Sequence, residues 1–169
     1  MQGTEGRGNF TEARHLLDEA LTLARSAQHQ RLIAGILHNL AYVELQEGQY
    51  EKAAGMLAAA LRIHKSLDRE LGIVQILLGY GALACDREQF ELGARLFGAA
   101  EAWRERLGQS VDPFDRIELA TGNVERLDRA RSALGATFDR VWAEGRALSR
   151  VDALASAAPL APPAEAGPP

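Results

Sequence analysis

The sequence predicts an all-α fold in which antiparallel helix pairs stack into a superhelix that ends in a C-terminal helical cap. Three observations support this prediction. The sequence repeats itself at a fixed interval, the one that separates residues 10, 50 and 90; its apolar residues recur with the ~3.6-residue period of a helix; and residues 1–112 contain no proline. No segment shows the period-two alternation of a half-buried strand.

The internal repeat is visible as columns of like residues in three copies, without a gap. An aromatic residue is followed after three positions by a small residue, after four more by a large one and after three more by alanine. The columns are Phe10, Tyr50 and Phe90; Ala13, Ala53 and Gly93; Leu17, Leu57 and Phe97; and Ala20, Ala60 and Ala100. Upstream, Leu37 and Leu77, Leu40 and Tyr80, and Ala41 and Gly81 also align. Small residues let two helices approach closely, and the large residues fill the space one turn later.

The first element is a half repeat at residues 10–29, preceded by a flexible N-terminus at 1–9. Gly8 and Gly48 stand two residues before an aromatic residue. Glycine adopts backbone geometries that other residues avoid, so we expect a turn at each of them. Two complete repeats follow at 31–66 and 69–107. The expected helices are 11–28, 31–47, 50–66, 69–87 and 91–107.

The C-terminal third predicts a helical cap over residues 108–156. Asp112-Pro113 favours a turn, and helices are expected at 114–134, 136–146 and 149–156. The bulky side chains available to join cap and repeats are Trp103, Phe114, Phe138 and Trp142. The remaining residues, 157–169, are rich in proline and alanine with few apolar anchors, so we expect them to be disordered.

Composition excludes several classes of protein. The chain is 47% hydrophobic and 25% charged, and none of its apolar runs approaches the length of a membrane span. The polar N-terminus predicts no secretory signal, and the single cysteine, Cys85, fits a reducing cytoplasm. The net charge is −4, and nine arginines in residues 104–150 are interspersed with eight acidic residues, which argues against nucleic-acid binding.

No catalytic, metal or cofactor pattern emerges from the residues. The glycines at 3, 6 and 8 neither follow a strand nor precede the Lys-Ser/Thr of a phosphate-binding loop. The four histidines stand at 15, 29, 38 and 64, apart from one another and without metal-ligand spacing. We therefore expect a protein that is not an enzyme and that needs no cofactor.

The turn and the small-x-x-x-large spacing after it resemble the second helix of a tetratricopeptide repeat. Leu37-x-x-Leu40-Ala41 and its counterpart Leu77-x-x-Tyr80-Gly81 resemble the first-helix motif. The sequence departs from that family in four ways. Leucine replaces the aromatic residue near the start of the first helix, and Glu44 and Ala84 stand at the family's later tyrosine position. The terminal proline is missing, and the interval from Phe10 to Tyr50 is longer than the usual period of about 34. HEAT-type repeats have a similarly long period and remain the alternative.

A second resemblance covers residues 94–154. The strings ARLFGAAEAWRERLG and FDRVWAEGRALS resemble the ending of actinobacterial multidomain regulators of the LuxR/NTPase type. That likeness implies a sensor or interaction segment within a larger cytoplasmic transcriptional or signalling regulator. A free-standing adaptor or self-associating scaffold is the alternative, and an accessory protein to an enzyme is the weakest.

The tetratricopeptide resemblance implies a partner-binding groove lined by the first helix of each repeat. The residues that this implies are His38, Asn39, Tyr42, Gln46, Gln75, Leu78 and Cys85, with Gly35 and Ala82 beside them. An asparagine one turn from a tyrosine can hold the backbone of an extended peptide, because its amide offers both donor and acceptor.

The partner expected from this resemblance is a protein, a peptide or another domain of the same polypeptide. The first repeat lacks its first helix, so an apolar face is left without a cover. Either the chain is part of a longer protein, or a second copy covers this face as a homodimer.

Overall fold

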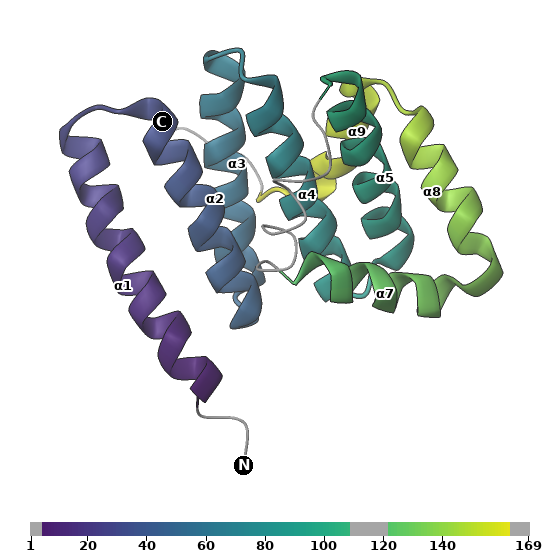
Figure 1. Ribbon diagram of the computed structural model, residues 1–169, viewed down its shortest axis with the longest axis horizontal. Helices are drawn as coiled ribbons and strands as arrows, with labels where there is room; N and C mark the ends of the chain where they lie inside the picture. The colour runs from purple at the N-terminus through teal and green to yellow at the C-terminus, as the bar shows by residue number, and fades with distance from the viewer. Residues whose placement is uncertain (1–4, 109–121, 163–169) are drawn as a thin grey trace, which may run out of the picture.

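The computed structural model describes residues 5–108 and 122–162 (Figure 1). The described residues form α-helices and two short 3-10 helices, without a strand. The α-helices are α1 Glu5–Ser26, α2 Gln30–Gln46, α3 Tyr50–Ser66, α4 Glu70–Asp86, α5 Phe90–Arg106, α7 Asn123–Leu134, α8 Phe138–Ala147 and α9 Arg150–Ala157, and the 3-10 helices are Gly135–Thr137 and Ala158–Leu160. Consecutive helices pack as antiparallel pairs (Figure 1), which confirms the predicted all-α superhelix of tetratricopeptide type.

The four helices α2 to α5 are each 17 residues long, and their first residues, at positions 30, 50, 70 and 90, are evenly spaced. This spacing is set by turns of one type. One residue of each turn takes a positive φ, and the next amide donates to the carbonyl five positions back, as Gln49 does to Glu44 at 2.8 Å. The positive-φ residues of the turns are Gln28, Gly48, Asp68 and Glu88, and Gly108 after α5 has the same sign of φ. Local structure therefore repeats twice within each sequence repeat.

The core follows the repeated columns. Ala53, Leu57 and Ala60 on α3 have no exposed surface, and Phe97 and Ala100 on α5 are buried. The small residue at 93 allows α5 to approach α4 closely, because a Cβ on Gly93 would lie 2.4 Å from the Cys85 sulfur on α4. The columns thus mark the face of each second helix that packs on its first helix.

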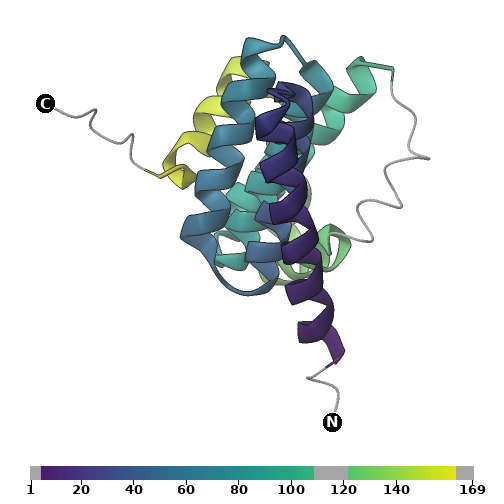
Figure 2. The same cartoon turned by 90° about the vertical axis from the view of Figure 1, so that its left-hand side faces the viewer.

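The cap is built on α5. α8 packs along α5 through two glycines: a Cβ on Gly145 would lie 2.1 Å from the Arg95 carbonyl oxygen, and a Cβ on Gly98 would lie 2.6 Å from that of Trp142. Beside this contact Phe138 and Val141 are buried. α9 packs against α4 and α5. Figure 2 shows α1 at one end of the stack, with α9 along a flank.

Three expectations about the ends of elements need correction or lie outside the description. The turn expected at Gly8 is wrong, because α1 is helical from Glu5 onward. Disorder from residue 157 is wrong as far as residue 162, because Leu160 lies in a 3-10 helix, buried and packed near α4. Residues 163–169, Phe114 and the expected start of the helix at 114–134 lie outside the described residues.

Candidate binding groove

The first helices of the two repeats, α2 and α4, line the inner face of the superhelix, and α7 lies across that face. Figure 1 shows α7 running past the lower ends of α4 and α5. It packs against both helices. The segment expected to cap only the last repeat therefore also enters the groove.

Two polar contacts hold α7 in the groove. The Nδ2 of Asn123 donates to the Tyr42 hydroxyl at 2.8 Å. The Arg126 guanidinium donates to both carboxylate oxygens of Asp86, with Nε at 2.9 and 3.0 Å and Nη2 at 2.7 Å. Both side chains of this ion pair are more than nine-tenths buried. A paired guanidinium fork in such a site fixes orientation, and Arg129 adds a longer contact to Asp86 at 3.3 Å.

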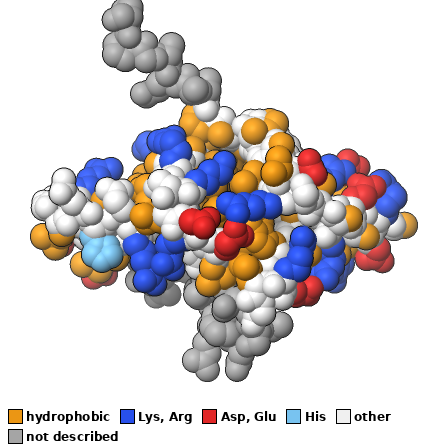
Figure 3. All heavy atoms as spheres, turned by 90° about the horizontal axis from the view of Figure 1, so that it is seen from above, with side chains coloured by type: hydrophobic (Ala, Val, Ile, Leu, Met, Phe, Trp, Pro, Cys, Tyr) orange, Lys and Arg blue, Asp and Glu red, His pale blue; other side chains and the backbone are white. Residues whose placement is uncertain are grey.

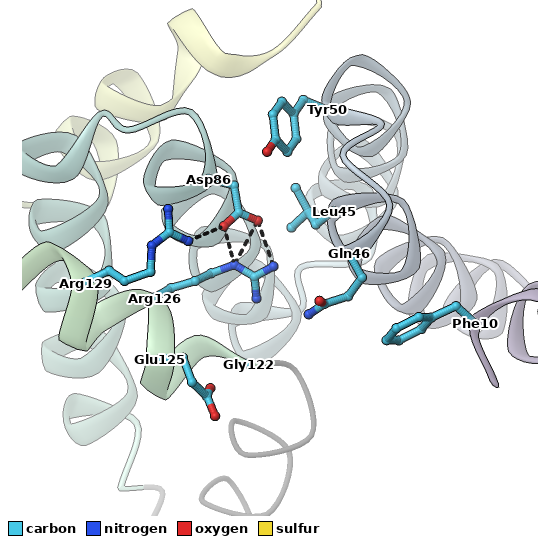
Figure 4. A pocket seen from close by; sticks show the side chains of 9 residues that line it. All are labelled: Phe10, Leu45, Gln46, Tyr50, Asp86, Gly122, Glu125, Arg126 and Arg129. Atoms are coloured by element: carbon cyan, nitrogen blue, oxygen red, sulfur yellow. Dashed lines mark hydrogen bonds and ion pairs between the residues drawn. The ribbon is translucent and has the colours of Figure 1, made fainter. Parts of the chain in front are cut away.

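An open pocket of about 510 Å³, here called the end pocket, lies where α7 meets the C-terminal ends of α2 and α4. Figure 4 shows the Asp86 carboxylate held by the two arginines on one side, with the Gln46 amide opposite. The lining residues are Phe10, Leu45, Gln46, Tyr50, Asp86, Gly122, Glu125, Arg126 and Arg129. Apolar and aromatic walls thus meet a group of charged and amide side chains.

Three of the groove residues implied by the resemblance stay accessible. Asn39 and Gln46 are exposed and Gln75 is half-buried. Gln46 lines the end pocket, and its Nε2 would lie 3.2 Å from a Cβ on Gly122, the residue before α7. The accessible amides lie on both inner helices, Asn39 and Gln46 on α2 and Gln75 on α4.

His38 and Tyr42 are buried. Their rings meet edge to face, with centroids 5.1 Å apart. Burial lowers the pKa of His38 to about 4, an effect opposed by a backbone hydrogen bond at Gln75 and reinforced by the neighbouring His64. His38 is therefore a neutral side chain at neutral pH, and it supports Tyr42 from behind.

The expectation that Cys85 and Ala82 line an open groove is wrong, because neither has exposed surface. Gly93 is the residue that packs on the Cys85 sulfur, and burial raises the pKa of this thiol to about 12. Leu78 is also buried, and it lines a cavity beneath α7 rather than an open groove. Spacing along α4 alone does not show which inner positions another helix covers.

Sequence reasoning missed Asp86, Arg126 and Arg129, as well as the role of Phe10 and Tyr50 as pocket walls. Asn123, Arg126 and Ala130 follow one another at helical spacing and are all buried. This spacing was a usable signal, but a stripe containing an amide and an arginine resembles a solvated surface. Phe10 and Tyr50 are members of the repeated aromatic column, and both are half-buried at the pocket.

Other kinds of site are missing from the part of the chain that the structure describes. Those residues contain no group of three or more His, Cys, Asp or Glu side chains placed to hold a metal ion. Across residues 5–108 and 122–162, no helix is long and apolar enough to cross a membrane. The face in Figure 3 shows acidic and basic side chains intermingled with apolar ones.

Residues 33–67 match the family model of the tetratricopeptide repeat. This segment is therefore similar to one tetratricopeptide repeat. The matched segment spans most of α2 and all of α3, and α4 and α5 follow with the same helix lengths and the same spacing. This match favours the tetratricopeptide interpretation over HEAT-type repeats. None of the curated proteins and none of the solved structures compared with the chain matches it. Tetratricopeptide repeats generally bind other proteins through the concave face that stacked helix pairs form.

Proposed function

We propose that the chain is a protein-binding repeat segment whose inner face holds a polypeptide segment. The observation that supports this function is α7 itself. A 12-residue helix lies against the inner helices, held by Tyr42 of α2 and Asp86 of α4. An inner face that fixes one polypeptide segment through polar anchors has the chemistry to fix another beside it.

The partner segment binds where the inner face is still open. Gln46 and Asn39 offer amide donors and acceptors to a peptide backbone, and Phe10 and Tyr50 offer apolar surface to its side chains. Arg129, half exposed at the rim, is available to an acidic group of the partner. Apolar burial supplies most of the affinity and the amides fix the position of the peptide.

Affinity capture with paired variants tests this function. The Asn39→Ala/Gln46→Ala protein is compared with a Gln30→Ala protein, in which an exposed glutamine at the opposite end of α2 is lost. We expect partners that bind wild type and Gln30→Ala to be lost from the double variant. Identical partner lists from all three proteins would refute the assignment of the groove.

We also propose that this segment serves a larger cytoplasmic regulator. The support is the likeness of residues 94–154 to the ends of multidomain regulators. The reading frame upstream of Met1 tests it. Further repeats or a nucleotide-binding motif in frame would support the regulator, whereas a stop codon and ribosome-binding site immediately upstream would leave a free-standing adaptor.

The outer face of α1 favours a second function, self-association. Leu16 and Leu23 stand two turns apart on α1, 59% and 70% exposed, and Leu32 of α2 is 50% exposed. Large apolar side chains exposed together are typical of an interface. Light scattering tests this. A dimer that dissociates in Leu16→Glu/Leu23→Glu supports it, and a monomeric wild type at high micromolar concentration contradicts it.

A further inference from the structure

The turn from α1 to α2 and the turn from α3 to α4 lie at the same end of the stack, at the top of Figure 1. The end pocket lies at the opposite ends of α2 and α4. A helix of 17 residues is about 25 Å long, so the two turns form a separate surface. We call this surface the upper rim, and its side chains are Arg25, Arg31, Leu32, Lys65, Leu67 and Arg69.

The cations of the upper rim have no ion-pair partner in the described part of the chain. Arg25, Arg31 and Lys65 are exposed and Arg69 is half-buried. None of them forms an ion pair with any residue of 5–108 or 122–162. The repeat accounts for part of this charge, because Arg25 and Lys65 stand at the same position of consecutive copies. Exposed cations of this kind are available to an anionic group of another molecule.

Carboxylates do not cancel the charge of the upper rim. Residues 25–32 contain none, and residues 65–70 contain Asp68 and Glu70. The Glu70 carboxylate accepts from Trp103 Nε1 at 2.8 Å and from the Arg150 guanidinium, so a cation already balances it. Asp68 alone remains against the cations. The upper rim is therefore positive, although the whole chain carries −4.

Apolar surface accompanies this charge. Leu32, in the first turn of α2, is 50% exposed, and Leu67, at the end of α3, is 42% exposed. Cations stand within two residues of each leucine in the sequence. Figure 3 looks onto this end of the molecule, and its half that carries α1 shows several basic side chains and few acidic ones. Exposed leucines beside unpaired cations are typical of an interface with another molecule.

The packing of the helices sets the spacing that a ligand needs. α2 packs on α4, and packed helices lie about 8–10 Å apart. Arg31 stands at the beginning of α2 and Arg69 immediately before α4. The beginnings of these helices are therefore separated by about the length of three extended residues, at ~3.3 Å each. A segment with a carboxylate at every third position can thus reach both helices.

Two features favour a polypeptide over a flat anionic surface such as a membrane. Asp68 has a positive φ and is exposed in the turn, between Leu67 and Arg69. A plane of anionic headgroups pressed onto the turn would meet this like charge, whereas an extended segment can pass beside it. The two turns, residues 25–32 and 65–70, also contain no Trp, Tyr or Phe, the rings that commonly anchor proteins at a membrane interface.

We propose that the upper rim binds an acidic segment of a partner protein, in extended form, with carboxylates about three residues apart and apolar side chains between them. The carboxylates pair with Arg31, Lys65 and Arg69, and the apolar side chains pack on Leu32 and Leu67. This surface is additional to the inner face, and binding to it does not depend on the function proposed above.

The probe is a fluorescein-labelled peptide of Glu-Leu-Ser units repeated four times, and fluorescence anisotropy measures its binding. Gln replaces every Glu in one analogue, and Ser replaces every Leu in another. We expect a Kd of about 10–100 µM for the probe. An exposed ion pair changes Kd by about two- to fivefold, so the Gln analogue should bind about tenfold more weakly. The Ser analogue should bind about fivefold more weakly, because apolar burial is lost.

Variants locate the binding. Lys65→Glu and Lys52→Glu make the same chemical change and leave the chain with the same net charge, but Lys52 is exposed in the first turn of α3, at the other end of that helix. Lys65→Glu should raise the Kd of the probe about fivefold, and Lys52→Glu should change it by less than about twofold. Leu67→Ser should raise it about threefold. The Asn39→Ala/Gln46→Ala protein should bind the probe as wild type does, so a failure of the inner-face proposal is seen separately.

No binding of the probe at millimolar concentration would overturn the proposal. Equal affinity for the Gln analogue, or an equal Kd in the Lys65→Glu and Lys52→Glu proteins, would also overturn it. Binding to phosphatidylserine vesicles that Lys65→Glu abolishes, without binding of the peptide, would make the upper rim a lipid-binding surface instead. A dimer in light scattering that Lys65→Glu dissociates would make a second copy the occupant.

Discussion

Replacing Gly145 with alanine should push α8 away from α5 and weaken the packing of the cap on the last repeat. A Cβ at this position would lie 2.1 Å from the Arg95 carbonyl oxygen and 2.8 Å from its carbonyl carbon. These are backbone atoms, so no side-chain rotation relieves the overlap. Real Cβ contacts are not shorter than 3.0 Å, so α8 must move by at least 0.9 Å, the difference between 3.0 and 2.1 Å.

The size of the loss in stability follows from the side chains that move with α8. Crowding of this kind costs about 1–3 kcal/mol. A gap of ~0.5–1 Å also forfeits roughly a quarter to a half of the packing attraction, which for the buried Phe138 and Val141 amounts to about 1–2 kcal/mol. Alanine is a better helix former than glycine by ~1 kcal/mol. The free energy of unfolding should therefore fall by about 1–4 kcal/mol.

Urea denaturation followed by far-UV circular dichroism and tryptophan fluorescence measures this change. The matched control is Gly55→Ala on α3, where a Cβ would meet nothing within 4 Å. This control should gain about 0.5–1 kcal/mol from helix propensity alone. A Gly145→Ala protein as stable as wild type, beside a control that behaves as expected, would refute the packing argument.

Three further predictions concern stability. The pKa of His38 is about 4 in the folded protein and 6.5 in the unfolded chain, so its stabilising contribution is complete above pH 6.5 and is lost as the pH falls toward 4. The loss, about 3 kcal/mol, should appear as a Tm that falls over this pH range. In the His38→Gln protein the Tm should fall less. Asp86→Ala leaves Arg126 buried without its carboxylate and should cost about 3–5 kcal/mol, with faster hydrogen exchange in α7, whereas Asp86→Glu should recover part of the loss. Glu88→Gly removes a positive-φ strain of ~1–2 kcal/mol, but glycine loses ~0.5–1 kcal/mol more chain entropy on folding. Thermal unfolding should therefore show that the free energy of unfolding rises by about 0.5–1 kcal/mol.

The repeat region could be predicted because the four helices from α2 to α5 have one length and the turns between them one form. A position that is buried in one copy, such as Ala53 or Leu57, is therefore buried in the next copy as well. The turn predicted at Gly8 does not form because such a turn needs a preceding helix. The turn at Gly48 is fixed by bonds back to Glu44 and Leu45 of the preceding helix, and no helix precedes Glu5 among the described residues.

The inner face was predictable only in part. Helical spacing places Asn39, Tyr42 and Gln46 on one side of α2, but it says nothing of Asn123, which lies 81 positions further along the chain and covers Tyr42. The covering helix, α7, is polar on average, and its buried residues include an asparagine and an arginine, which a sequence pattern assigns to the surface. The spacing of Asn123, Arg126 and Ala130 marks a possible buried stripe, but the sequence around Arg126 does not show that Asp86 is its partner. The end pocket, which both residues line, depends on that pairing.

The evenly spaced turns have a consequence for the length of the array. Each turn has the same backbone geometry, so each helix pair sets the same starting direction for the next pair, whatever residues it contains. Duplicating one helix pair between α3 and α4 should add one step to the superhelix and carry α5 and α8 along as a block. It would also move Asp86 of α4 away from Tyr42 of α2, so α7 could keep only one of these two anchors. The distance between α1 and α5 along the axis of the superhelix would then change only in equal increments, one for each pair inserted or removed.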